Sequence, residues 1–473
     1  MNREVSIVWF RCDLRIADNE AIIEAAKKGT VLPIYILDDT LGDASKWWLH
    51  NSLQKLDESL QGKLNFYIGD ELEILRKIIA KYKVKTVFWN RRYEPYNIEK
   101  DSTIKLALQD EEIEVKTFNS ALLWEPWEVV KNDETPYKVF TPFYRNGCLK
   151  KLPRKPFVAT QKIDVIRDEN NKTTLKDLHL LPKIKWYKEI SKMWEVGEKA
   201  AQKKLEKFLK SGISNYNVGR DFPAQKSVSQ LSPHLHFGEI SPHQIWWKIY
   251  DKYSLEPTNK NFDRFLSELG WREFSYNLMY FFKGLPTDNF NNKFDKFPWL
   301  ELDENGKKFL RAWKKGQTGI PIVDAGMREL WQTGYMHNRV RMIVGSFLVK
   351  NLLIDWREGA KWFWNCLVDA DLANNSASWQ WVAGSGADAA PYFRIFNPIL
   401  QGEKFDADGE YVLKYVPELK NLPKEYLFKP WETPNDVLKR SDIVLGKTYP
   451  LPIIDIKKSR DLALLTYKTL SIN

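Results

Sequence analysis

Short apolar runs alternate with helical patterns over the first 120 residues of the chain. The runs are rich in β-branched and aromatic residues, as strands are, and the segments between them repeat apolar side chains every three or four residues. The pattern predicts strands over residues 5–10, 31–37, 64–68, 86–89 and 115–118, and helices over 19–28, 45–60, 71–82 and 98–108. Strands that alternate with helices indicate an α/β domain built on a doubly wound parallel sheet.

The pattern changes after residue 120. Prolines and charged runs interrupt residues 121–200, which predicts a long connection across the surface. Helical patterns dominate from about residue 200, for example over 199–209, 262–282 and 340–353. We therefore expect an α/β domain over residues 1–130, a connector over 131–200 and an all-α domain over 201–473.

Several protein classes are excluded by composition. No apolar run reaches the roughly 18 residues of a membrane span, and the N-terminal residues lack the apolar core of a signal peptide. The three cysteines, Cys12, Cys148 and Cys366, form no CxxC pair, so neither a disulfide framework nor a zinc site is predicted. We expect a cytoplasmic protein that binds no metal and no membrane.

The net charge of +10 is concentrated in the middle of the chain. Residues 151–350 carry a net charge of +13, whereas residues 1–150 carry −2 and residues 351–473 carry −1. Such a block is typical of a surface that binds a polyanion. Lysines that only solubilise a surface would produce the same count, so both interpretations stay open at this point.

The chain contains 20 tryptophans, and five of them crowd into 26 residues: Trp356, Trp362, Trp364, Trp379 and Trp381. One buried tryptophan is usually a packing residue, but this density beside polar residues also favours a stacking or electron-transfer site. The preceding helical pattern repeats Asn338, Met342 and Gly345 along one flank, which indicates that this flank faces something other than an apolar core.

Two carboxylates follow in the same region. Asp369 and Asp371 are two residues apart, so they do not share a helix face and mark a helix end or a loop. Capping and metal binding are both compatible with this spacing. His234 and His236 have no third metal ligand nearby in the sequence, so we expect them to pack or cap.

Segments along the whole chain, in order, resemble the photolyase/cryptochrome family. They are WFRCDLRIADN (9–19), GDASKWWLHNSL (42–53), YKVFTPFYR (137–145), YNVGRDFPA (216–224), SQLSPHLHFGEISP (229–242), WREF (271–274), GQTGIPIVDAGMREL (316–330), the stretch 335–400 and QGEKFD (401–406). The resemblance implies an N-terminal antenna domain and a C-terminal helical domain that binds FAD. It is strongest to the bacterial class I enzymes that repair cyclobutane pyrimidine dimers, in which an electron passes from photoexcited reduced FAD to a dimer flipped out of DNA.

The resemblance also implies a set of residues that contact FAD. Ser229 and Ser232 frame a segment in which Pro233 begins a helix, an arrangement that suits a diphosphate. Arg339 and Asp369 match a pair beside the flavin ring, which favours the cofactor over a metal for the two carboxylates. The full set is Tyr216, Val228, Ser229, Gln230, Leu231, Ser232, Phe265, Glu268, Arg272, Asn338, Arg339, Asp369, Ala370, Asp371 and Asn375.

Catalytic roles are implied for two polar residues and for a relay of tryptophans. Asn375 matches the position that faces the flavin N5, and Glu268 the carboxyl at the edge of the dimer. Trp379 and Trp356 match the inner and middle members of a relay that reduces the flavin from outside. Trp299 matches the outer member, and Trp313, fourteen residues further on, is the alternative.

The implied partner is damaged DNA. Glu268 and Trp271 are spaced i and i+3, so they face one way on a helix and can read a flipped lesion by edge contacts and stacking. The full set of expected DNA contacts is Arg220, Glu268, Trp271, Arg272, Asn338, Arg339, Met342, Trp381 and Arg394.

Two other functions are compatible with the family. A cryptochrome would bind FAD and signal through a partner, but many of them carry a long C-terminal extension that we do not expect here. Repair of (6-4) lesions resembles pockets with histidines where this chain has Asn338 and Met342. The antenna chromophore stays open among folate (methenyltetrahydrofolate), a deazaflavin, FMN and an empty pocket, and the resemblance favours a monomer.

Overall fold

A computed structural model describes residues 4–38, 40–158, 163–255, 258–392 and 394–470. The chain forms two compact units, which are described separately below. Unit 1 comprises Met1–Ser214, Ser229–Lys283 and Val368–Ala373, and unit 2 comprises Asn215–Val228, Gly284–Leu367 and Asn374–Asn473.

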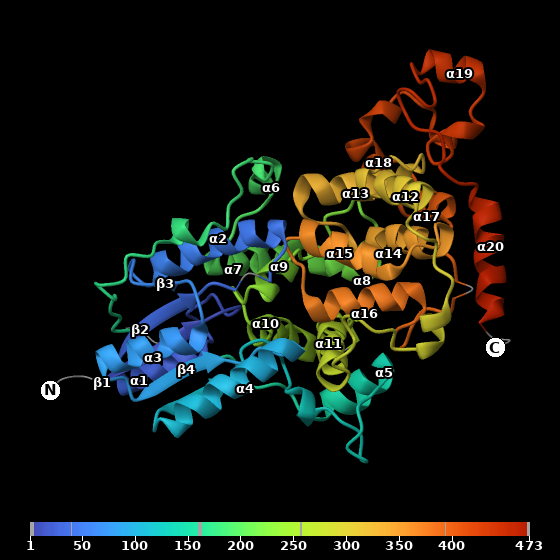
Figure 1. Cartoon of the computed structure of the whole chain (residues 1–473). Coiled ribbons are helices and arrows are strands. Elements are labelled where there is room, and N and C mark those ends of the chain that lie inside the picture. Colours follow the sequence, from blue (N-terminus) through green and yellow to red (C-terminus); the bar gives the residue numbers. More distant parts are fainter. Residues whose placement is uncertain (1–3, 39, 159–162, 256–257, 393, 471–473) are drawn as a thin grey trace. The chain divides into compact units, whose positions relative to one another are not determined.

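Unit 1 begins with a parallel sheet of five strands in the order β3-β2-β1-β4-β5 (Figure 1). The strands are β1 (Glu4–Phe10), β2 (Gly29–Ile36), β3 (Asn65–Tyr67), β4 (Thr86–Asn90) and β5 (Glu114–Phe118). The intervening helices are α1 (Glu20–Lys28), α2 (Asp43–Ser59), α3 (Glu71–Tyr82) and α4 (Pro95–Asp110). The reversal of strand order at β1 makes the sheet doubly wound, so the predicted fold class and its strands are confirmed.

The sheet is buried on both faces, as parallel sheets are. Ile7 to Phe10 of β1 are at most 2% exposed. One face packs against apolar residues of α3 and α4 such as Leu75 and Leu108, and right-handed crossovers direct α1 and α2 to the other face. Helix α3 starts where predicted, because the Asp70 side chain accepts a hydrogen bond from the Glu73 amide at 2.9 Å.

The rest of unit 1 contains a mostly irregular connector and then helices. The predicted connector contains only short elements, among them α5 (Phe140–Pro142) and α6 (Lys188–Met193). The helices after it are α7 (Glu198–Lys207), the short α9 (Ser232–His236), α10 (Pro242–Leu255) and α11 (Lys260–Phe281). The sequence predicted the starts of α7 and α11 to within two residues.

Unit 2 is all-helical in its described residues. Its helices are α8 (Tyr216–Gly219), α12 (Glu304–Lys315), α13 (Pro321–Thr333), α14 (Asn338–Ser346), α15 (Trp356–Cys366), α17 (Pro398–Phe405), α18 (Glu410–Tyr415), α19 (Asn435–Arg440) and α20 (Ile456–Thr469). Helix α16 (Leu372–Ala383) begins in unit 1 and continues in unit 2. The predicted helix over 340–353 is α14 followed by a π-helical turn, Phe347–Asn351. No helix in the described ranges is both long and apolar enough to cross a membrane.

A buried carboxyl joins α11 to the segment that follows β5. Glu273 is 3% exposed, and its side chain accepts hydrogen bonds from the Leu123 and Trp124 amides at 2.8 and 3.4 Å. Burial raises the pKa of Glu273 to about 7, against the lowering effect of Arg272 and of these two amides. The folded protein therefore holds a proton here that the unfolded chain has already lost between about pH 4.5 and 7.

We predict that Glu273→Gln removes this part of the pH dependence of stability. An acid whose pKa is raised on folding loses stability as the pH rises from its unfolded to its folded pKa, here by about 3 kcal/mol. Relative to the native protein, the variant should gain about this much between pH 4 and 8 in urea unfolding. Glu58→Gln on the exposed surface is the matched control. A difference between native and Glu273→Gln that does not change with pH would contradict the prediction.

Candidate functional site

In unit 1, the turn before α16 carries Asp369 and Asp371, and each is engaged by protein side chains. Asp369 accepts a hydrogen bond from the Ser232 hydroxyl at 2.6 Å. Asp371 accepts one from the Tyr276 hydroxyl at 2.5 Å and lies 3.4 Å from Nδ1 of His236. Burial would raise the pKa of Asp371, but His236, Arg272 and the Tyr276 hydroxyl outweigh it and lower that pKa. Asp371 is therefore a fixed, buried anion.

The two histidines of α9 are buried and paired, as expected for packing residues. His234 Nδ1 lies 2.5 Å from Glu239, which also accepts the Trp48 indole N–H at 3.0 Å. His236 pairs with Asp371, and its Nε2 has no hydrogen-bond partner among the described residues. An unsatisfied buried nitrogen beside a fixed anion favours a polar ligand at this point. The described residues contain no group of three His, Cys, Asp or Glu side chains arranged for a metal.

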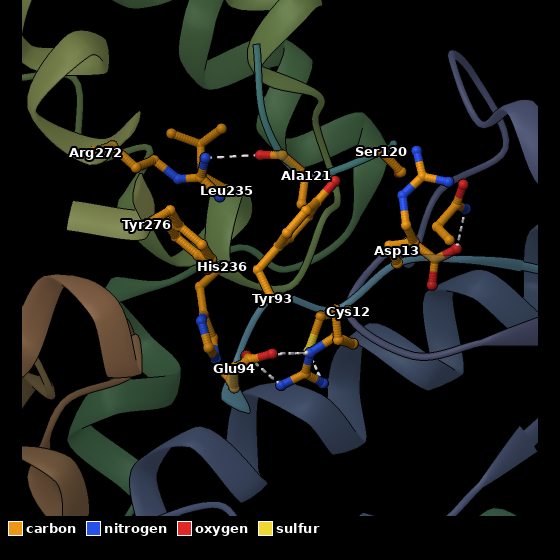
Figure 2. Close-up of a pocket in the computed structure, with 13 residues that line it drawn as sticks. Cys12, Asp13, Tyr93, Glu94, Ser120, Ala121, Leu235, His236, Arg272 and Tyr276 are labelled. Atoms are coloured by element: carbon orange, nitrogen blue, oxygen red, sulfur yellow. Dashed lines mark hydrogen bonds and ion pairs between the residues drawn. The ribbon is translucent and has the colours of Figure 1, made fainter. Parts of the chain in front are cut away.

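A small cavity lies next to this network (Figure 2). Its volume is about 20 Å³, enough for one water molecule and far too small for a nucleotide. The lining residues come from the ends of β1 and β4 and from the helical part of unit 1: Cys12, Asp13, Asn90, Arg91, Arg92, Tyr93, Glu94, Ser120, Ala121, Leu235, His236, Arg272 and Tyr276.

Helix α11 carries four of the predicted site residues. Phe265 packs on Phe208 with ring centroids 4.8 Å apart, and Trp271 stacks on Phe140 at 3.8 Å. Glu268 lies 3.5 Å from Arg264, one turn away on the same helix. Arg272 turns inward, donating to the Ala121 carbonyl at 2.7 Å with its guanidinium 4.9 Å from the ring centroid of Tyr276. The Arg272 side chain is thus held by contacts inside unit 1.

The predicted phosphate segment leads into α9. Ser232 is the first residue of α9 and Pro233 the second, so the predicted helix start is correct. Gln230 adopts φ +52°, in the left-handed region that a side chain rarely enters. The Leu231 amide then donates to the Ser229 hydroxyl at 3.4 Å. This turn brings two serine hydroxyls to the start of the helix.

Unit 2 holds Arg339 by several contacts. Its guanidinium donates to Asp221 at 2.7 Å and lies 4.3 Å from the ring centroid of Phe405, and its Nε has no hydrogen-bond partner in the described chain. Asn375 donates its amide to the Ala360 carbonyl at 3.1 Å. Because the amide nitrogen of Asn375 faces Ala360, its amide oxygen faces away from Ala360.

The predicted residues differ widely in exposure. The buried ones are Tyr216, Arg220, Leu231, Phe265, Asp369, Ala370, Asp371, Trp356 and Trp379. Those partly exposed are Val228, Ser229, Gln230, Glu268, Trp271, Arg272, Trp299, Arg339, Met342, Asn375 and Trp381, and the exposed ones are Ser232, Asn338 and Arg394. Arg220 was expected to contact DNA, but it is buried, with its guanidinium 5.6 Å from the ring centroid of Tyr216.

The tryptophans of unit 2 form a packed group around α15. Trp379 lies against Gly359, where a Cβ atom would approach the indole to 2.1 Å. Trp356 is three residues before Gly359 on the same helix, so the two share a face. Trp313 packs on Trp379 with centroids 6.2 Å apart and is fully buried, whereas Trp299 is partly exposed.

Two polar residues of this group were missed in the sequence. Asn289 accepts the Trp356 indole N–H at 2.9 Å, and Gln380 hydrogen-bonds to the loop that carries Asn289. Sixty-seven positions separate Asn289 from Trp356, so no local pattern joins them. Tyr276 was also missed, although it follows Arg272 by one helical turn and could have been found by that spacing.

Comparison with known proteins gives the same picture for both parts of the chain. Residues 6–161 match the family described as DNA photolyase, and residues 265–469 match the FAD binding domain of DNA photolyase. A deoxyribodipyrimidine photo-lyase of Agrobacterium fabrum is 48% identical over 469 residues, covering 98% of this chain and 97% of that protein. Cryptochrome-1 of Arabidopsis thaliana is 34% identical over 485 residues, and the match covers 96% of this chain and 69% of that protein.

A solved structure is similar throughout. It is a bacterial class III photolyase from Agrobacterium tumefaciens, with a TM-score of 0.95, 46% identity and coverage of 100% of this chain and 99% of that one. The parallel sheet, the helical units and the matched domains define a flavin-binding protein of the photolyase type. The chain belongs to the photolyase/cryptochrome family.

Each unit, taken by itself, contains polar groups of the kind that the FAD of this family requires. Unit 1 offers the Ser229 hydroxyl, the fixed anion Asp371 and the unsatisfied Nε2 of His236, while the Ser232 hydroxyl already donates to Asp369. Unit 2 offers Arg339, whose Nε is buried without a partner among the described residues. Hydroxyls, a cation and free donors are the groups that a flavin, a ribityl chain and a diphosphate require.

We predict that Gly359→Ala displaces the Trp379 indole. The added methyl would overlap the ring, and overpacking of this kind typically costs about 1–3 kcal/mol. Gly345→Ala is the matched control, because its methyl would lie 3.6 Å from the same indole and 3.2 Å from Cγ1 of Val382, without overlapping the ring. Urea unfolding of both variants, with Trp379 fluorescence isolated by comparison with Trp379→Phe, measures the effect. Equal stability of the two glycine variants would disprove the contact.

Proposed function

We infer that the protein repairs cyclobutane pyrimidine dimers in DNA by a light-driven lyase reaction. The observation that carries this function is the 48% identity to a deoxyribodipyrimidine photo-lyase, because it extends over 469 residues and therefore over both units. Bound FAD, in its reduced form, supplies the electron that light drives into the dimer. The residues of this chain hold the cofactor, read the lesion and pass electrons inward from solvent.

Within the family, class III is the assignment proposed here. The sequence predicted class I, and that finer assignment is not confirmed, since the solved structure with 46% identity is a class III photolyase. A TM-score of 0.95 over the full chain supports the same class for this protein.

The proposed cofactor contacts follow from the polar groups of each unit. In unit 1, Ser229 provides a hydroxyl for the diphosphate, and Ser232 holds Asp369 at the start of α9 by its own hydroxyl, while Asp371 stays anionic at a fixed position. In unit 2, the Arg339 guanidinium favours an anionic flavin by Coulomb attraction. Asn375 offers an amide oxygen toward the flavin N5, while its amide nitrogen stays bound to Ala360.

The proposed lesion contacts lie mainly on α11. The Trp271 ring lies parallel to the Phe140 ring, and this stacking fixes its orientation so that it can stack on a flipped base. Glu268 lies one turn before Arg272 and hydrogen-bonds to the edge of the dimer. In unit 2, Asn338 and Arg394 are exposed, and Met342 is partly exposed and adapts to a non-planar lesion.

The proposed relay runs from Trp379 through Trp356 to Trp299. A relay needs an outer member that a reductant in solution can reach. Trp313 is fully buried and donates its indole N–H to the Val344 carbonyl at 3.1 Å. Trp299 is partly exposed, which supports it as the outer member over Trp313.

The coarser organisation is proposed as follows. Residues 1–130 form the antenna domain, 131–200 the connector and 201–473 the FAD domain. The antenna pocket holds a folate, a deazaflavin or FMN, or is empty, and the protein acts as a monomer. The cytoplasm is its proposed location because its substrate, DNA, lies there in bacteria.

Photoreduction should fail in Trp379→Phe and in Trp356→Phe, because phenylalanine packs similarly but is far harder to oxidise. Trp299→Phe should slow the reaction and Trp313→Phe should not. Flavin bleaching under blue light with a thiol reductant measures all four variants, normalised to flavin content. A normal rate in Trp356→Phe would show that electrons take another route.

Measurements of DNA affinity should distinguish residues that bind phosphates by their charge from residues that recognise the lesion. The central +13 charge predicts that affinity falls with salt by roughly 0.9 log units per log unit of salt for each neutralised phosphate. Arg394→Ala should weaken damaged and undamaged DNA alike and lower this slope by about one contact. Trp271→Ala should lose about 1–3 kcal/mol, mainly on damaged DNA, with an unchanged slope.

Binding isotherms at several salt concentrations, on strands with and without one thymine dimer, measure these effects. Arg440→Ala and Trp331→Ala change exposed residues outside the proposed site and are the matched controls. Equal affinity of the native protein for both strands would reject lesion recognition and favour a photoreceptor of the cryptochrome type. Tighter binding to a strand with one (6-4) lesion than to a strand with a thymine dimer would favour repair of (6-4) lesions.

A further inference from the structure

In Trp356, the middle tryptophan of the proposed relay, the indole N–H donates a hydrogen bond to a side chain. Trp356 is fully buried, and its Nε1 donates to Oδ1 of Asn289 at 2.9 Å. Asn289 is itself 8% exposed. Water is therefore excluded from this hydrogen bond, and the acceptor is a neutral amide.

The loop that carries Asn289 is fixed by hydrogen bonds from two helices. Gln380, the residue after Trp379, donates to the Leu285 and Asp288 carbonyls at 2.8 Å each and accepts from the Phe290 amide at 2.8 Å. Arg357 of α15 donates to the Thr287 carbonyl at 2.6 Å. Asn289 is consequently held in place by the neighbours of both inner relay tryptophans.

The orientation of the Asn289 amide follows from its second partner. Its Nδ2 donates to the Asp295 carboxylate at 2.8 Å. Because a carboxylate only accepts hydrogen bonds, the NH₂ group must face Asp295, and the oxygen is left to face the indole. The carboxylate also polarises the amide, which makes its oxygen a better acceptor.

One neighbour opposes oxidation of Trp356. The Arg357 guanidinium lies 4.7 Å from the ring centroid, where a cation disfavours a second positive charge. Asp355 pairs with Arg357 at 3.0 Å and offsets part of this effect. The hydrogen bond to Asn289 stabilises positive charge on the indole from its other edge.

We propose that Asn289 is a positioning residue that keeps oxidised Trp356 protonated. The proposal rests on the relay proposed above. An indole that has lost one electron becomes a strong acid, and a basic neighbour would take its Nε1 proton and leave a neutral radical that is harder to reduce. An amide oxygen accepts the hydrogen bond but is far too weak a base to take the proton.

The electrons and protons balance along this path. Trp379 has given one electron to the flavin, and one electron leaves the Trp356 indole to refill it while the Nε1–H bond stays intact against Asn289. One electron from Trp299 then restores Trp356. A thiolate in solution gives one electron to Trp299 and is left as a thiyl radical. No proton moves at position 356, so this step is fast and insensitive to solvent deuterium.

The test replaces the Asn289 amide by a carboxylate, which is a stronger base, or removes the side chain's acceptor altogether. In Asn289→Asp combined with Asp295→Asn, which keeps a hydrogen-bond donor facing the new carboxylate, transient absorption above pH 7 should show the neutral indolyl radical, a solvent deuterium effect and a several-fold lower yield of photoreduction. In Asn289→Ala, the cation radical should form in several-fold lower yield. Asn291→Asp, on the same loop, is the matched control, since that side chain accepts from the Lys293 amide. A native radical spectrum and yield in both Asn289 variants would overturn the proposal.

A second measurement reports on the hydrogen bond without using the photoreaction. In FAD-loaded protein with ¹⁵N-labelled tryptophan, the Trp356 indole N–H should exchange slowly with solvent and should exchange faster in Asn289→Ala. Unchanged exchange would also overturn the proposal. Trp356→Phe separates this outcome from failure of the relay: normal photoreduction in that variant removes Trp356 from the path, whereas lost photoreduction with unaltered Asn289 variants rejects only the role of Asn289.

Discussion

A buried indole is held by close packing of its ring and, where an acceptor faces it, by a hydrogen bond from its N–H. In unit 2 such contacts hold Trp313, Trp356 and Trp379. Trp379 can lie against α15 because Gly359 has no side chain, and Trp313 and Trp356 each have a hydrogen-bond acceptor within 3.1 Å. These contacts fix the rings of Trp356 and Trp379, which are the middle and inner members of the proposed relay.

Unit 1 solves a related problem with charged groups. Asp371, His236, Tyr276 and Arg272 are mutually paired in the interior, where an unpaired charge would be costly. The pairing keeps Asp371 anionic and leaves one nitrogen of His236 without a partner in the described chain. Networks of this kind are satisfied when a polar ligand completes them, which supports the proposal that these residues contact the cofactor.

Much of the fold could be predicted from the sequence because its signals are local. Alternating strand and helix periods determined the sheet, and Asp70 marked the start of α3. The resemblance to the family supplied Trp356 and Trp379, whose motif is continuous along the chain. Asn289 and Gln380 could not be found in this way, since their contacts join loops and helices far apart in sequence. The burial of Trp313 and Arg220 likewise depends on packing that no spacing reveals.

The function of this chain as a light-driven lyase for cyclobutane dimers can be tested directly. The measurement follows the absorbance of a strand with one thymine dimer, mixed with purified and prereduced protein, in blue light and in the dark. We predict that the dimer reverts to two thymines only in the light, and that a strand with one (6-4) lesion stays unchanged. A dimer that persists in the light, in protein with full flavin content, would contradict it.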